Sequence, residues 1–512
     1  MRAGQRAPRV QTARQGACAT SAAVSAHAAS PSARGNLRSG LAAPQKLPSL
    51  SPGAMVAGPA GRPCVVTRPL GKGSFGTVWG AQTLDGACIA IKEVRCVSQA
   101  QLARVVEEGQ LLEIMRQEVL AVGGPQLAER VPMLFVSHVD ALTPQSWRVR
   151  LVMSEVSGQS LQEVLATRYD VGRLQRVADL DECRSQLVEA CTCAGELIAQ
   201  LAPVLEAFSS KIYHRDITPR NIQVAGLETG KPKFGLVDFG LAVDAGVWRC
   251  DEGSGDLGGD GRYWPSSAWF AFGHGVRELR RHRDLEREYR TCLDAHSLGL
   301  SVLQCFLAMM PDVGVAGELE EEPSWSEVLP CFWSLKAMWG TYWSDASSAW
   351  RPLFEAFCGA GDFEELRSSY KRAGTHRVIH KDIVALRRSL ELGSGACRAQ
   401  QSEPALLAVA TLFDAILLML HFGAESPGSE AASESTVLLR KRGAGAPDGS
   451  AKVCLASACL GARPPPRPRR PHRPARQGTA ARSALGRPPA RAPLPRAQRA
   501  SARAAQPRGR VC

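Results

Sequence analysis

A run of three glycines is the first feature of the sequence that could do chemistry. Gly71, Gly73 and Gly76 are spaced so that a strand–turn–strand backbone can pass close over a row of phosphates, where a β-carbon would clash. A dinucleotide-binding turn has similar glycines, but it needs a helix directly after the third one. The residues after Gly76 read Thr-Val-Trp-Gly and favour a continuing strand. This stretch therefore predicts a hairpin that covers phosphate groups.

A lysine at the end of an apolar stretch is the second such feature. Residues 88–91 are small or apolar, and Lys92 follows them directly. We interpret Lys92 as pointing into a cleft, where its compact charge can hold phosphate oxygens; the alternative is a surface lysine on an edge strand. A buried cation needs a carboxylate partner. The helical period over 99–121 puts Glu108, and not Glu107, on the apolar face, so we predict Glu108 as that partner.

Two short motifs further along the chain carry oxygen-bearing side chains. Residues 213–221 read Tyr-His-Arg-Asp-Ile-Thr-Pro-Arg-Asn, and residues 235–240 read Gly-Leu-Val-Asp-Phe-Gly. Asp216 could orient a hydroxyl group and accept its proton. Asn221 and Asp238 offer hard oxygen ligands, which suit Mg²⁺ bound through one or two protein groups plus substrate phosphates. The two motifs together predict a small magnesium–phosphate site.

The elements that must position these motifs fall into two parts. Strand patterns dominate from residue 63 to about 157, apart from the helix over 99–121, and helical patterns dominate from about residue 185. Short strand pairs are expected near 211–224 and 233–238 within the helical part. A strand-rich part followed by a helix-rich part predicts an α+β enzyme with two lobes.

All four motifs, in this order, resemble the signature of the eukaryotic-type protein kinases over residues 63 to about 424. The resemblance implies a protein-kinase-like fold, with a small β-rich N-lobe over about 63–157 and a larger helical C-lobe, with inserts, over about 158–424. It implies transfer of the γ-phosphate of ATP to a protein hydroxyl with Mg²⁺, Ser/Thr being favoured over Tyr. The alternatives are an ATP-binding pseudokinase or scaffold without phosphotransfer and, less favoured, a small-molecule kinase of similar fold.

The resemblance also implies roles for single residues. Asp216 would accept the proton of the substrate hydroxyl, and Lys92, paired with Glu108, would hold the α and β phosphates. The family's usual lysine two residues after the catalytic aspartate is replaced by Thr218. Arg220 is therefore expected to supply the positive charge near the γ-phosphate.

The metal and nucleotide contacts follow from the same resemblance. Asn221 and Asp238 would bind Mg²⁺, and Met153 would guard the back of the adenine pocket. Residues 293–310 look like the start of the family's central buried helix. The residues expected to contact the nucleotide are Leu70, Gly71, Lys72, Gly73, Ser74, Gly76, Val78, Ala90, Lys92, Met153, Glu155 and Val156.

The segment after Asp238 departs from the family pattern. Ser267 stands where the family carries a glutamate that anchors the C-lobe. Arg215, beside the catalytic aspartate, would normally be neutralised by a phosphate on this segment. We expect acidic residues, Asp260 and those within 251–256, to substitute in part for that phosphate, with Ser254 as a secondary phosphorylation site. The basic stretch 277–283 is interpreted as a solvated insert, and a substrate-docking surface is the alternative.

The net charge of +13 comes from the two ends of the chain. Residues 1–62 hold eight Arg or Lys and residues 449–512 hold fifteen, neither with any acid, which leaves −10 for the middle. We expect 1–62 to be a disordered basic tail, the alternative being an organelle transit segment. We expect 425–512 to be a disordered linker and a Pro/Arg/Ala-rich tail. An anionic partner for these tails is the alternative to a solvated segment without a role.

Two further features of the sequence bear on where the protein is located and on whether it spans a membrane. Sixteen cysteines without a repeated spacing favour a reducing compartment, so we expect an intracellular protein, cytoplasmic or nuclear. The apolar run 404–421 is interrupted by Asp414 and falls short of the about 20 residues of a membrane span. We predict a buried helix there and no transmembrane segment. The sequence leaves the protein substrate and the oligomeric state open.

Overall fold

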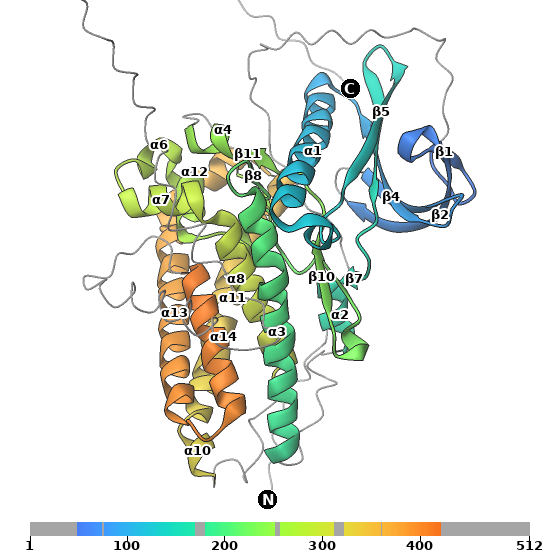
Figure 1. Ribbon diagram of the computed structural model, residues 1–512. Coiled ribbons are helices and arrows are strands. Elements are labelled where there is room, and N and C mark those ends of the chain that lie inside the picture. Colours follow the sequence, from blue (N-terminus) through green and yellow to red (C-terminus); the bar gives the residue numbers. More distant parts are fainter. Residues whose placement is uncertain are drawn as a thin grey trace, which may run out of the picture. The chain divides into compact units, whose positions relative to one another are not determined.

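The structure, a computed structural model, describes residues 49–73, 76–168, 180–250, 257–311, 322–359 and 361–420 (Figure 1). Strands gather in the first part of this range and helices in the second, so the chain is an α+β protein, as the sequence predicts. Its arrangement is compatible with two lobes. The eleven cysteines whose side chains the structure describes are free thiols.

A curled antiparallel sheet of six strands forms the first part, in the order β1-β2-β3-β4-β6-β5. The alternation of buried and exposed residues along β5 is that of a strand with one covered face. β4 has four successive buried residues, Ile89 to Lys92, because it lies in the middle of the sheet. The strands are β1 (Met55–Ala57), β2 (Pro63–Gly73), β3 (Gly76–Thr83), β4 (Cys88–Cys96), β5 (Leu134–Thr143) and β6 (Ser146–Ser154).

Helix α1 (Gln99–Ala128) packs on this sheet and carries the predicted apolar period. It starts at Ser98, whose side chain accepts a hydrogen bond of 3.2 Å from the backbone N–H of Gln101. Its regular path is interrupted at Gly124, whose backbone is not helical, directly before Pro125. The apolar face of α1 joins the core that continues into the helical part of the chain.

Short strands connect the sheet to the helices and carry the loops of chemical interest. Three of them form a small antiparallel sheet, β10 (Lys233–Leu236), β9 (Ile222–Ala225) and β7 (Gln159–Ser160). Another pair consists of β8 (Ile212–Tyr213) and β11 (Val243–Asp244). The predicted strand pairs near 211–224 and 233–238 are therefore confirmed in position, although they are only two to four residues long.

The helical part is built around α8 (Leu293–Met309), which is buried on nearly every side (Figure 1). Two further long helices, α3 (Leu180–Phe208) and α14 (Pro404–Leu420), pack against it. α13 (Thr375–Ala399) lies between α14 and α11 (Leu329–Phe357). The shorter helices are α2 (Leu161–Arg168), α4 (Ala245–Cys250), α5 (Ser266–His274), α6 (Val276–Leu279), α7 (Arg283–Thr291), α10 (Pro323–Ser326) and α12 (Phe363–Ala373).

Among the described helices, α3 is long and apolar enough to cross a membrane by length and composition. More than half of its most apolar window is nevertheless buried inside the structure, which is the behaviour of a core helix. Helices α7 and α8 pass the same test only as one pair, which is bent by 77°. The predicted buried helix over 404–421 is confirmed as α14, whose apolar residues lie in the core.

The expectation of disorder throughout residues 1–62 is wrong for residues 49–62. There β1 pairs with β2, and Leu50 is buried in a small apolar cluster on the outer side of the sheet. The backbone N–H of Leu50 donates to Glu93 of β4 at 3.3 Å. The low apolar content of this segment led to the prediction of disorder. That prediction failed because the segment is stabilised by pairing with β2 and not by its own composition. The C-terminal tail lies outside the described residues.

Candidate active site

Lys92 is the centre of a buried ion-pair network. Its Nζ donates to Glu108 Oε1 of α1 at 2.7 Å and to Asp238 Oδ1, in the loop after β10, at 3.0 Å. The Lys92 and Glu108 side chains are only 7% and 6% exposed. Burial by itself disfavours the charged amine, but Asp238 and Glu108 raise the pKa of Lys92 above its ordinary value. The predicted pairing with Glu108 is confirmed, and Glu107 is exposed.

Asp216 and Asn221 form a second contact in the loop between β8 and β9. Asn221 Nδ2 donates to Asp216 Oδ2 at 2.8 Å and to the Asp216 carbonyl at 2.9 Å. The other carboxylate oxygen, Oδ1, accepts the backbone N–H of Asp260 at 3.0 Å. Burial, together with the Asp260 carboxylate, raises the pKa of Asp216 to about 7. A carboxyl group with this pKa can exchange a proton near neutral pH.

The start of this loop is held by a buried carboxylate of the central helix. Asp294, in the first turn of α8, accepts the backbone N–H of His214 at 2.7 Å and that of Arg215 at 2.8 Å. Arg215 has a left-handed backbone, with φ of 66°. A non-glycine residue in this region costs free energy, and such residues cluster at functional sites. Asp294 therefore holds the loop in a conformation that Arg215 alone would not favour.

His214 links the two loops of the site. Its Nε2 lies 3.1 Å from the Val237 carbonyl, and its Nδ1 accepts the Asp216 backbone N–H at 3.3 Å. Burial lowers the pKa of His214 to about 4, so the ring is neutral at pH 7 and Nε2 is the donor. Phe239 packs edge-on against the His214 ring, with 4.6 Å between centroids. The motif of residues 213–221 and the Asp-Phe-Gly motif of residues 238–240 are thus packed together.

Asp238 has the second left-handed backbone of the site, with φ of 65°. One described residue elsewhere, Ala60, is the other non-glycine of this kind. Asp238 Oδ1 faces Lys92, and the Gly240 backbone N–H approaches it at 3.4 Å. Burial would raise the pKa of Asp238, but Lys92 outweighs it and the pKa is lowered. Asp238 is therefore an ionised carboxylate.

Asn221 and Asp238 each leave one oxygen of the hard type that Mg²⁺ prefers. Asn221 uses its amide N–H groups on Asp216, and Asp238 uses Oδ1 on Lys92. Within the described part of the chain no group donates to Asn221 Oδ1 or Asp238 Oδ2, so these two oxygens remain as hard ligands. The described residues contain no group of three or more His, Cys, Asp or Glu that could hold a metal. A cation here would need phosphate oxygens as further ligands.

The glycine-rich hairpin uses its glycines in two ways. A β-carbon added to Gly71 or Gly73 would have no heavy atom within 4 Å in the described structure, so both face open space. A β-carbon on Gly76 would instead collide with the backbone oxygen of Glu93 on β4. Gly76 is thus required by strand packing, whereas Gly71 and Gly73 leave room for a ligand. Lys72, between them, is exposed, and Ser74 lies outside the described residues.

Four of the residues expected to contact the nucleotide are apolar and belong to, or pack against, the large apolar core. Ala90 of β4 and Met153 of β6 are opposite each other in the sheet and are both buried. Leu70 and Val78 of the hairpin are partly buried and pack against the same cluster.

Glu155 and Val156, which follow β6 and are expected to contact adenine, both contact other strands. Glu155 forms an ion pair of 2.8 Å with Arg68 of β2. Val156 packs so closely on Gly235 of β10 that a β-carbon at Gly235 would collide with it. The segment after β6 is therefore fixed both to β2 and to β10.

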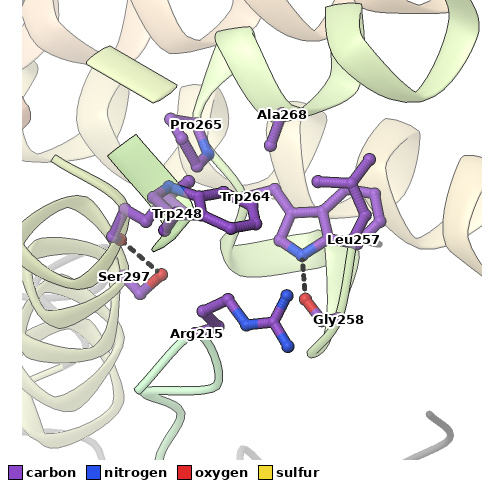
Figure 2. Close-up of a pocket in the computed structure, with 9 residues that line it drawn as sticks. Arg215, Trp248, Leu257, Gly258, Trp264, Pro265, Ala268 and Ser297 are labelled. Atoms are coloured by element: carbon purple, nitrogen blue, oxygen red, sulfur yellow. Dashed lines mark hydrogen bonds between the residues drawn. The ribbon is translucent and has the colours of Figure 1, made fainter. Parts of the chain in front are cut away.

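Arg215 is held by a partner that the sequence analysis missed. Its guanidinium lies over the Trp248 ring, 5.3 Å from the centroid, and its Nε donates to the Leu241 carbonyl at 2.7 Å. Figure 2 shows Arg215 at the edge of a small pocket whose wall includes Trp248 and Trp264. Trp264 Nε1 donates to the Gly258 carbonyl at 2.9 Å. Aromatic residues scattered along the sequence gave no periodic signal for this arrangement.

The expected role of Asp260 is wrong. Asp260 forms an ion pair with Arg262 at 2.5 Å, and not with Arg215, and its backbone N–H is bonded to Asp216. Acidic side chains within 251–256 and Ser254 lie outside the described residues. The basic stretch 277–283 is mostly exposed, as a solvated insert should be.

Ser267 is bound by a carboxylate from another helix. Glu288 of α7 accepts the Ser267 backbone N–H at 2.8 Å. Arg220, the last predicted site residue, lies beside α2, where its Nε approaches Gln162 Oε1 at 3.5 Å.

The sequence was also compared with known families and proteins. No protein-family description matches the chain, and no curated protein matches it. Any functional assignment therefore depends on the four motifs and on the geometry of Lys92, Glu108, Asp216, Asn221 and Asp238.

Proposed function

We propose that the chain is a protein kinase that transfers the γ-phosphate of ATP to a protein hydroxyl with Mg²⁺, Ser/Thr being favoured over Tyr. One observation carries this proposal. Lys92 binds both Glu108 and Asp238, and Asn221 binds Asp216. His214 joins these two groups of residues, because its ring contacts the Val237 carbonyl directly before Asp238. Residues separated by up to 146 positions are thus brought together with the chemistry that phosphoryl transfer needs.

Each side chain has a definite task in this proposal. Lys92, held by Glu108, aligns the phosphate chain of ATP by its positive charge. Asp216 orients the acceptor hydroxyl and takes its proton, which its pKa of about 7 permits near neutral pH. Asn221 and Asp238 would hold Mg²⁺, which supplies positive charge to the transferred phosphoryl group when bound.

Radiolabelled ATP, Mg²⁺ and a peptide array test the proposal on the full chain. We expect incorporation of label by the wild type and its loss, by about a hundredfold or more, in D216N and D238N. D284N is the matched control, because Asp284 is an exposed aspartate on α7. The array also identifies the acceptor residue. Full turnover by D216N would contradict the proposal.

An ATP-binding protein without phosphotransfer is the second candidate, and one observation favours it. Both carboxylate oxygens of Asp216 already accept hydrogen bonds, from Asn221 and from the Asp260 backbone. A hydroxyl group must share one of these oxygens with a bond that is already present. ATP binding measured by calorimetry, in the absence of any label transfer to protein or peptide, would support this candidate and exclude the kinase.

A further inference from the structure

One oxygen of the Asp216 carboxylate is bound by the segment that precedes α5. The backbone N–H of Asp260 donates to Oδ1 at 3.0 Å, and Asn221 Nδ2 donates to Oδ2 at 2.8 Å. With both oxygens bound, the carboxylate has a fixed orientation in the loop between β8 and β9. Gly259 permits this approach, because its φ is 86° and a β-carbon there would collide with the Arg215 carbonyl oxygen. The orientation of Asp216 therefore depends on where this segment lies.

The Asp260 side chain is held in turn by Arg262. Arg262 Nε donates to both carboxylate oxygens, Oδ1 at 3.0 Å and Oδ2 at 3.2 Å, and Nη2 donates to Oδ2 at 2.5 Å. The backbone N–H of Arg262 also donates to Asp260 Oδ1 at 3.0 Å, so Asp260 caps the 3-10 turn Gly261–Tyr263. The Arg262 and Asp260 side chains are 26% and 18% exposed. The ion pair and the cap together fix Asp260, and with it the direction of its backbone N–H.

Helix α11 supports the same turn from its other side. The Arg262 guanidinium lies over the Trp343 ring, 4.8 Å from the centroid. The Arg262 carbonyl accepts the hydroxyl of Tyr342, a fully buried side chain, at 2.5 Å. A β-carbon at Gly261 would lie 2.7 Å from the Trp350 ring, so the turn also packs tightly against α11 further along that helix. A chain of contacts thus runs from α11 through the turn to the segment that binds the site carboxylate.

We propose that Arg262 is a positioning residue for Asp216, because it holds Asp260 on α11 so that the Asp260 N–H keeps the Asp216 carboxylate oriented toward the acceptor hydroxyl. This inference rests on the proposed kinase function, in which Asp216 takes the proton of that hydroxyl. Arg262 also offsets the charge of the Asp260 carboxylate, which would otherwise repel Asp216. A displacement of about 1 Å at a reacting group can cost about a hundredfold in rate. Arg262 therefore acts on the transfer step through Asp260.

A merely structural role and a positioning role differ in what they change. An arginine that only stabilises the fold leaves the rate constant of the folded molecules unchanged. An arginine that orients Asp216 changes the transfer step, whereas the affinity for ATP, whose phosphates are aligned by Lys92 in the proposed function, stays the same. Arg184 of α3 is a matched control, because its Nε and Nη2 bind Glu403 at 3.0 Å and 2.8 Å and its side chain is 33% exposed. It lies near the start of α3, at the opposite end of that helix from β8.

The experiment compares single-turnover phosphorylation of one peptide by the full-length wild type, R262Q, R262K and R184Q, with ATP affinity from calorimetry and the folded fraction from urea denaturation. We expect R262Q to slow transfer by about ten- to a hundredfold while the Kd for ATP is unchanged. R262K keeps the charge but not the planar fork, so its rate should lie between the two. R184Q should lose stability without any loss of transfer rate. If R262Q does not fold, R262K decides the question.

A double variant tests the route through Asp260. If Arg262 acts through this carboxylate, D260N/R262Q should transfer no more slowly than R262Q alone. Losses that multiply, an equal slowing in R262Q and R184Q, or a wild-type rate in R262Q and R262K would each overturn the inference while leaving the kinase proposal intact. Absence of transfer to any peptide by the wild type would contradict the kinase proposal itself, and the inference with it.

Discussion

The carboxylate of Glu288 accepts the backbone N–H of Ser267 at 2.8 Å. This bond joins α7 to the first turn of α5, where free N–H groups and the helix dipole favour a negative charge. Burial raises the pKa of Glu288, while Ser267 and Arg387 of α13 act in the opposite direction. The link ties the end of the segment after Asp238 to two helices.

Removing the Glu288 carboxylate should loosen this segment. We expect E288A to lower the free energy of unfolding by about 1–3 kcal/mol, because the buried Ser267 N–H loses its acceptor. E288Q should lose less, since an amide oxygen can still accept the bond. Urea denaturation measures both, and E286A on the same helix is the control, with an expected change within about 0.5 kcal/mol. Equal losses in E288A and E286A would contradict the link.

The pair of Glu107 and Glu108 offers an internal comparison on α1. E108A leaves Lys92 buried with one carboxylate partner in place of two, and breaking a buried pair typically costs about 3–5 kcal/mol. We expect a loss toward the lower end of that range, because Asp238 remains. Exposed Glu107 should tolerate alanine within about 0.5 kcal/mol. Chemical denaturation measures stability, and calorimetry with ATP measures whether the variant loses the ATP binding that we propose for Lys92.

The hairpin glycines should respond differently to alanine. G76A forces a methyl group into the backbone of Glu93, so it should destabilise the sheet by more than about 1 kcal/mol. G73A meets no neighbour, so it should fold with nearly unchanged stability. If ATP passes beneath the hairpin, G73A will weaken ATP binding even so. Thermal unfolding and ATP titration of the two variants provide the measurement, and a stable G76A would refute the packing role.

The pKa of Asp216 predicts a pH dependence of phosphoryl transfer. The carboxylate form accepts the proton, and the fraction of that form falls as the pH drops below about 7. We expect kcat/KM, which reports the free enzyme, to fall by up to tenfold for each pH unit below this value. Rates of peptide phosphorylation between pH 5 and 9 at subsaturating peptide provide the profile. A flat profile through pH 6 to 8 would show that proton transfer to Asp216 is not controlling the rate.

The candidate site residues could be predicted because their spacing is local. Lys92 lies in the middle of β4, and Asp216, Asn221 and Asp238 each lie in a short motif next to a strand. Glu108 required only the helical period, which set it apart from its neighbour Glu107. The predicted pairing of Lys92 with Glu108 agrees with the structure, because a strand and a helix each fix the direction in which their side chains point.

The contacts between distant segments could not be predicted in the same way. Trp248 over Arg215, Asp260 on Asp216 and Glu288 on Ser267 each join elements whose relative position depends on the packing of several helices. No period or spacing encodes such a meeting. The resemblance led us to expect that Asp260 helps to neutralise Arg215, but Arg262, only two residues from Asp260, binds that carboxylate.

The strand at Met55–Ala57 has a practical consequence for anyone who prepares a shorter protein. A fragment beginning at residue 63 would remove the cover over Val66, Ile91 and Val152 and turn β2 into an open border with unpaired amide and carbonyl groups. Two such fragments could join along that border, so light scattering should report self-association that a fragment beginning at residue 49 does not show.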